Sequence, residues 1–247
     1  LYLMGFNALQ IRNGFNQKGQ THPFDPEALS EFLQEHTQTH YLRWYTSLVL
    51  LFRRRKFLSG TFLLDCIAIT VESDLYEKIG RVLDKKGIVR YKGYKVACLA
   101  NLLPNHKLVV VALMVFPINV VDLACGKILL NHILRTQGVG FIQDLIMDMG
   151  FLDGRWLHAL QERYHIDVFI PVRENMDILA DAIGLAQYAR VPWTAVKGQP
   201  GREVALLLEL TTWDSSQMPL NCCLVRDKKP DGTYTYWAIV TPKAVQS

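Results

Sequence analysis

The sequence lacks the cysteine pattern of a zinc site or of a disulfide framework. Its five cysteines are odd in number, two of them are adjacent, and no pair has C-x-x-C spacing. Four of them stand among apolar neighbours, which is typical of buried thiols in a reducing compartment. We therefore expect neither a thiolate zinc site nor disulfide bridges.

Long hydrophobic runs are also missing. The longest apolar stretch, 108–121, is interrupted by Pro117 and Asn119 and is too short to span a bilayer. The chain does not open on the basic and then apolar pattern of a signal peptide. We expect no membrane partner and a cytoplasmic location.

Charge of one sign is not in large excess. The 247 residues include 27 Lys and Arg against 23 Asp and Glu, which gives a formal net charge of +4. This mildly basic balance permits a nucleic-acid partner without requiring one. Half of the residues are hydrophobic, which is enough to bury a sizeable core.

Hydrophobic spacing predicts an α/β protein with a mixed sheet. Strands are expected over 62–71, 92–97, 107–116, 141–147 and 166–172, followed by a β-rich tail with strands over 204–210, 220–226 and 234–240. Helices are expected from Pro26 to about Phe52, from Ser73 to a stop at Gly87, over 122–135, and around Leu152 to Leu160.

Two aspartates stand at strand positions where a carboxylate is informative. Asp65 lies within the apolar run 62–71, where a charge is costly unless it is paired or binds a metal. Asp148 ends the strand over 141–147, at an open edge of the sheet. If these strands are neighbours, the two carboxylates could converge on Mg²⁺ or Mn²⁺, which prefer oxygen ligands. Salt-bridged or surface-facing aspartates are the alternative interpretation.

Five motifs follow one another around these aspartates. They are Leu63-Leu64-Asp65-Cys66-Ile67-Ala68-Ile69, Tyr91-Lys92-Gly93-Tyr94-Lys95-Val96, Pro117-Ile118-Asn119-Val120-Val121-Asp122, Asp148-Met149-Gly150-Phe151-Leu152-Asp153 and Ile166-Asp167-Val168-Phe169-Ile170-Pro171-Val172-Arg173. The series resembles the catalytic strands and turns of bacterial insertion-sequence DDE transposases over residues 62–175. The most specific motif is the Asp-x-Gly-aromatic sequence that begins at Asp148.

The resemblance implies a ribonuclease-H-like mixed sheet with flanking helices. It divides the chain into a helical N-terminal region (1–58), an incomplete catalytic core (59–190) and a β-rich insertion near the C-terminus together with the start of the return strand (191–247). Asp65 and Asp148 would be the first two acids of a metal-binding triad that holds Mg²⁺ or Mn²⁺. The implied partners are transposon terminal inverted repeats and target DNA, bound by a homodimer.

The third acid of the resembling family has no counterpart here. In that family it is a Glu on a helix that follows the insertion, whereas Glu203 and Glu209 stand in strand-like sequence. The run from Tyr236 to Thr241 resembles the strand that precedes this helix, and the chain as given ends shortly afterwards. We therefore expect the chain as given to lack an intact active site.

Basic residues near these motifs are candidate contacts to DNA phosphates. They are Arg53, Arg54, Arg55, Lys92, Lys95 and Arg173. Solvated surface positions are the alternative for each of them.

Two other functions remain open. A ribonuclease-H-like nuclease would cut DNA without strand transfer, and a catalytically inactive transposon remnant would only bind DNA.

Overall fold

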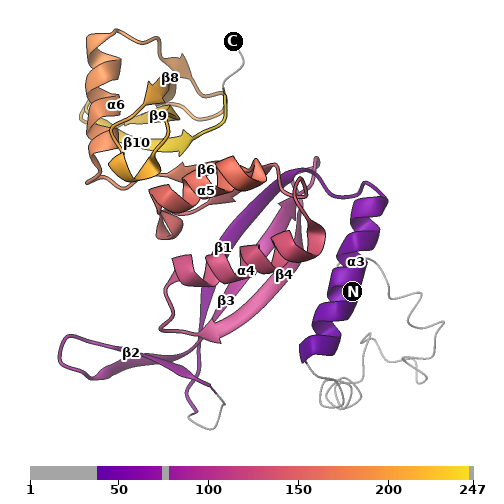
Figure 1. The fold of residues 1–247 in the computed structure, drawn as a ribbon. Helices are drawn as coiled ribbons and strands as arrows, with labels where there is room; N and C mark the ends of the chain where they lie inside the picture. Colours follow the sequence, from indigo (N-terminus) through magenta and orange to yellow (C-terminus); the bar gives the residue numbers. More distant parts are fainter. Residues whose placement is uncertain (1–37, 74–77, 245–247) are drawn as a thin grey trace, which may run out of the picture. The chain divides into compact units, whose positions relative to one another are not determined.

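A computed structural model describes residues 38–73 and 78–244 of the chain (Figure 1). The chain divides into two compact units, 1–49 and 50–247, with the boundary inside helix α3 (Gln38–Arg54). α3 agrees with the last part of the helix expected from Pro26, and 26–37 lie outside the described residues. All the described strands and the other described helices belong to the second unit.

The central sheet begins with three antiparallel strands. β1 (Thr61–Thr70) pairs with β3 (Val89–Leu102), and β3 pairs with β4 (Leu108–Pro117). β5 (Asp144–Met147) and β6 (Asp167–Pro171) then extend the sheet in parallel beside β1. The order β4–β3–β1–β5–β6, antiparallel and then parallel, confirms the predicted α/β, ribonuclease-H-like fold class.

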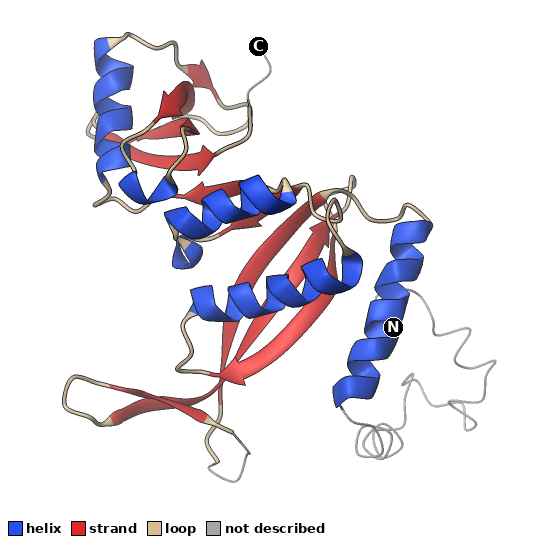
Figure 2. Ribbon diagram, viewed as in Figure 1, coloured by secondary structure: helices blue, strands red, loops and turns tan. Residues whose placement is uncertain are grey.

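Two helices connect the parallel strands. α4 (Asp122–Gln137) packs on β1, β3 and β4, and α5 (Gly154–Tyr164) packs on β6 (Figure 2). Gly126 allows α4 to approach closely, because a Cβ there would lie 2.6 Å from the Phe151 ring and 3.1 Å from Leu64. The core between α4 and the sheet includes the fully buried side chains of Phe62, Leu64, Leu99 and Leu129.

The β-rich region continues the same sheet. β10 (Tyr234–Thr241) pairs antiparallel with β6, and β9 (Leu220–Lys228), β8 (Arg202–Leu210) and the short β7 (Thr194–Ala195) follow outward. α6 (Asp177–Tyr188) contacts β8, β9 and β10. These three long strands agree with the strands expected over 204–210, 220–226 and 234–240, whereas α6 was not expected.

One expected helix is wrong. Of the segment from Ser73 to Gly87, residues 74–77 lie outside the described residues, and Gly80–Leu83 forms β2, which pairs antiparallel with the start of β3. Gly87 has φ +80° and belongs to a hairpin turn rather than to a helix end. The Asp84 side chain accepts the N–H groups of Lys86 and Ile88 at 2.8 and 2.9 Å and so stabilises this turn.

Two expected strands differ in length from the observed ones. β3 is longer than the predicted 92–97, and β5 is shorter than the predicted 141–147. Two of the five cysteines are buried and three are half-buried, and all five are free. None of the helices in the described part of the chain is long and apolar enough to cross a membrane.

Candidate metal-binding edge of the sheet

The carboxyl end of β5 brings Asp148 beside Asp65. β1 and β5 run parallel, and their last registered pair is Leu64 with Met147. The residues that follow this pair are Asp65 and Asp148, on neighbouring strands that lie about 4.8 Å apart. The sequence could predict each aspartate, but only the strand order places them at one edge.

Asp65 is not buried, so the expected burial cost does not apply. The β1 face that carries Asp65 also exposes Ile67 and Ile69. One oxygen of Asp65 accepts the N–H of Cys66 at 2.7 Å. Across the β1–β3 pair, Asp65 faces Cys98. The carboxylate is therefore accessible to a ligand without first breaking a buried ion pair.

Asp148 begins the short 3-10 helix η2 (Met149–Phe151). Its side chain is exposed and accepts the N–H of Gly150 at 2.8 Å. A Cβ on Gly150 would meet Asp148 Oδ1 at 2.9 Å and Asp122 Oδ2 at 3.2 Å. Phe151 is fully buried. The Asp-x-Gly-aromatic motif thus has a local physical basis: a capping acid, a position with little space for a side chain, and a core anchor.

Asp122 is a third carboxylate at this edge, at the first turn of α4. It forms an ion pair with Lys95, whose amino group lies 2.5 Å from Asp122 Oδ1 and donates to the Val120 carbonyl at 2.6 Å. The sequence predicts a helix over 122–135 but gives no sign that Asp122 approaches Gly150. Lys95, a predicted DNA contact, has its charge occupied within the protein.

Arg173 lies close to the loop that carries Asp148. It follows β6, is exposed, and donates from Nη2 to the Met149 carbonyl at 3.3 Å. A neighbouring cleft of about 390 Å³ is lined by Leu123, Asp153, Arg173, Met176, Trp213 and others. Arg173 is therefore a cation at the loop that carries Asp148.

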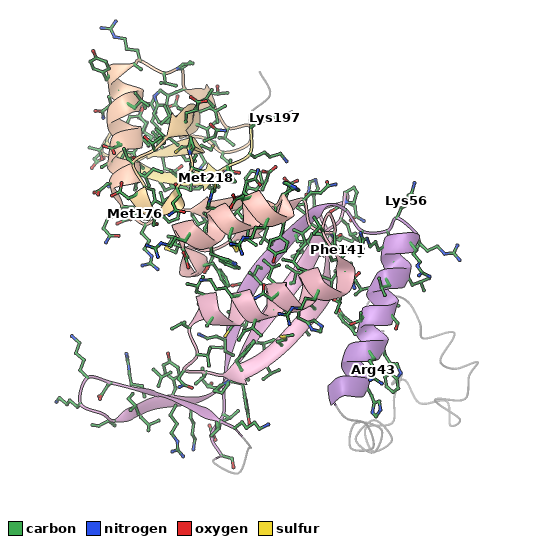
Figure 3. All side chains as sticks on the ribbon, viewed as in Figure 1. Arg43, Lys56, Phe141, Met176, Lys197 and Met218 are labelled. Carbon is green, nitrogen blue, oxygen red and sulfur yellow. The ribbon has the colours of Figure 1, made fainter. Side chains whose placement is uncertain are left out.

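The other predicted DNA contacts lie elsewhere in the fold. The Arg53 guanidinium donates to the Gln137 carbonyl and lies 5.3 Å from the centre of the Phe141 ring, which is labelled in Figure 3. Arg54 and Arg55 are exposed at the end of α3. Lys92 lies on β3 opposite Arg81 of β2. Arg53 thus has a structural contact in addition to any role in binding.

The cysteines near Asp65 are not thiolates at neutral pH. Burial raises the pKa of Cys66 to about 12, and the negative charges of Asp122 and Asp65 act in the same direction. Burial and the charge of Asp65 also raise the pKa of Cys98. The thiolate, and not the protonated thiol, is the nucleophile and the ligand for soft metals. The metal donors at this edge are therefore carboxylate oxygens.

Glu203 and Glu209 are both on β8, far from this edge. β5, β6, β10 and β9 separate β8 from β1 in the sheet, which amounts to roughly 24 Å at the usual strand spacing. Glu203 also pairs with Arg226 at 2.7 Å. Within the described residues, no group of three or more His, Cys, Asp or Glu is arranged to hold a metal ion. Asp65 and Asp148 fit a hard cation in donor chemistry, as two neighbouring carboxylates.

Comparisons with known proteins give little further information. No family model matches the chain, and no curated protein matches it. Among solved structures, the crystal structure of the NurA nuclease from Sulfolobus solfataricus is similar, with 9% sequence identity and a TM-score of 0.35, over 90% of this chain and 83% of that chain. A likeness at this level carries no argument about activity.

Proposed function

We propose that this chain is the ribonuclease-H-like part of a bacterial insertion-sequence DDE transposase. The observation that carries the proposal is the position of Asp65 and Asp148 on neighbouring parallel strands, past their last registered pair. The five ordered motifs of the sequence support the same assignment. The proposed substrates are transposon terminal inverted repeats and target DNA, bound by a homodimer.

Asp65 and Asp148 would hold Mg²⁺ or Mn²⁺. Bound there, such ions activate a nucleophile and stabilise the leaving oxygen at a phosphodiester. The chain's own contribution is to orient the ligands: the Cys66 N–H holds one oxygen of Asp65, and the Gly150 N–H holds one oxygen of Asp148. Arg173, whose side chain reaches the Met149 carbonyl, would contact a DNA phosphate near Asp148.

A second candidate is a DNA-binding protein without catalytic activity. It is favoured by the lack of a three-residue metal-binding group in the described part of the chain. A nuclease without strand transfer would use the same two aspartates as a transposase. Strand-transfer assays with paired transposon ends would distinguish these last two, because only the transposase joins the ends to target DNA.

Titration with Mn²⁺ tests the metal site directly. Each of Asp65→Asn and Asp148→Asn removes one charged ligand and should weaken Mn²⁺ binding about tenfold or more, since loss of even an outer-shell partner typically costs about 10–100-fold in metal affinity. Asp144→Asn is the matched control, because Asp144 lies at the opposite end of β5 and pairs with Lys243. Equal Mn²⁺ affinity in the parent and all three variants, or a loss of Mn²⁺ affinity in Asp144→Asn alone, would refute the site.

A further inference from the structure

The hairpin of β2 and β3 carries the highest density of Lys and Arg among the described strands. Its residues 80–92, here called the cationic hairpin, contain one acid, Asp84, against the cations Arg81, Lys85, Lys86, Arg90 and Lys92. The Asp84 carboxylate already accepts two backbone N–H groups in the turn. The chain as a whole is nearly balanced, so this excess is local.

The cationic hairpin extends past the body of the sheet as a two-stranded ribbon. β3 pairs with β1 only from Gly93 onward, whereas residues 89–92 pair with β2 (Figure 2). Gly93 makes this departure feasible: its φ is +153°, and a Cβ there would lie 2.0 Å from the Ile69 carbonyl oxygen. Backbone conformation and lack of space therefore explain the glycine of the Gly93-Tyr94-Lys95 motif, which stands at the junction between the sheet and the ribbon.

Cations are brought together along the ribbon. Arg81 lies directly opposite Lys92 in the register, and the shift between Val82 and Leu83 leaves Arg90 in a β-bulge. Arg81, Arg90, Tyr91 and Lys92 also line a cleft of about 540 Å³. Lys85 and Lys86 are exposed at the tip.

We propose that the cationic hairpin is a DNA-contacting arm that lies in a groove of duplex DNA. Two strands about 4.8 Å apart, with their side chains, match a major groove about 12 Å wide, which admits a two-stranded β-ribbon. Lysine and arginine on such a ribbon contact the flanking phosphates. The choice of DNA as partner rests on the proposed function, whereas the location of the contact comes from the hairpin itself.

The flanking apolar residues of the ribbon suit a groove better than a phosphate surface alone. Leu83, Ile88 and Tyr91 are exposed by 55%, 62% and 43%. Apolar side chains contact the thymine methyl group and sugar edges within a groove, while cations reach the backbone on either side. An anionic lipid surface offers charge without a groove, and it is therefore the competing partner that the experiment must separate.

Fluorescence anisotropy with a labelled random-sequence duplex tests the arm across a salt series. The double variant Lys85→Ala/Lys86→Ala removes the tip charges without touching the paired strands. Losing up to two phosphate contacts should lower the slope of log K against log salt by up to about 1.8. We expect affinity to fall at least fivefold near 0.1 M salt, on the order of the salt effect of two contacts.

The matched control is Lys228→Ala/Lys229→Ala, at the turn between β9 and β10. It removes the same charge from another exposed hairpin tip. The proposal predicts that this control keeps the parent salt slope. Equal slopes for the parent and the Lys85/Lys86 variant, or equal losses in both double variants, would overturn it. Thermal melts of each variant should match the parent, since all four lysines are exposed.

Two further measurements separate this inference from the proposed function. A protein whose DNA complex depends on the cationic hairpin but that binds no Mn²⁺ would leave the arm standing and remove the metal site. If the protein binds Mn²⁺ but the Lys85→Ala/Lys86→Ala variant has unchanged DNA affinity, the metal site stands and the arm is overturned. Vesicles with anionic lipid serve as the other probe: hairpin-dependent binding to vesicles but not to duplex DNA would overturn the proposal.

Discussion

The two ends of β5 carry the same side chain in opposite settings. Asp144 opens the strand and is half-buried, and it accepts hydrogen bonds from Lys243 at 2.5 Å and from Thr61 at 3.4 Å. Asp148 follows the strand, is exposed, and accepts a backbone N–H from Gly150. Asp144 also lies opposite Asp167 of β6, which Lys243 approaches to 3.9 Å.

The difference shows why an aspartate is informative only in its tertiary setting. At the amino end of the parallel strands, Lys243, which follows β10, forms an ion pair with Asp144 and approaches Asp167 to 3.9 Å, so the charge of Asp144 is compensated within the protein. At the carboxyl end, Asp65 and Asp148 have exposed carboxylates held by backbone N–H groups. Only the second arrangement offers oxygen donors to an external cation.

The largest expected effect on stability is at the amino end. Lys243→Ala would leave Asp144 and Asp167 facing each other without a cation. The free energy of unfolding should fall by about 2 kcal/mol, less than for a fully buried pair because Lys243 is 45% exposed. Urea denaturation measures the change. Arg173→Ala is the matching substitution at the carboxyl end. It should change the free energy of unfolding by no more than about 0.5 kcal/mol, since Arg173 is exposed.

A smaller effect distinguishes the two aspartates of β5. Asp144→Asn removes the charged partner of Lys243 and should cost about 1 kcal/mol. Asp148→Asn should stay within about 0.5 kcal/mol, because asparagine also accepts the Gly150 N–H at a cap position. Chemical denaturation of both variants tests this order. If Asp148→Asn destabilised the fold more than Asp144→Asn did, the comparison between the two ends would be wrong.

The smallest expected effect concerns pH. Burial and the negative charge of Asp144 raise the pKa of Asp167 above its ordinary 3.8, although Lys243 opposes them. A raised pKa favours the protonated carboxyl in the fold, so this contribution to stability is fully present below 3.8 and is lost as the pH rises through the folded pKa. Asp167→Asn should therefore gain a few tenths of a kcal/mol over the parent at pH 7.

The pH dependence gives its own check on that variant. The advantage of Asp167→Asn should shrink as the pH falls toward 4, because the parent carboxyl then becomes neutral as well. Unfolding at pH 7 and pH 4 measures both values. An advantage that grows on acidification would mean that the charged form of Asp167 stabilises the fold, with Lys243 outweighing burial.

Much of the fold could be predicted from the sequence. The apolar runs at β1, β4 and β6 and the amphipathic pattern of α4 have the period of their elements, which local sterics and burial impose. The prediction of a helix after Ser73 was wrong because the apolar residues Ile79, Val82 and Leu83 fit both the helical and the strand period over so short a segment. The turn that contains Asp84 and Gly87 reverses the chain and makes this segment a hairpin.

The sequence by itself determined the α/β class, most strand positions and the two aspartates that merit attention, because these depend on residue type and local period. Only the tertiary structure decided that Asp65 is exposed, that Asp148 stands next to it, and that Asp144 is neutralised by Lys243. It also decided that the cations between residues 80 and 92 lie on one ribbon. Strand order and register bring together residues distant in sequence, and no local pattern records which strands become neighbours.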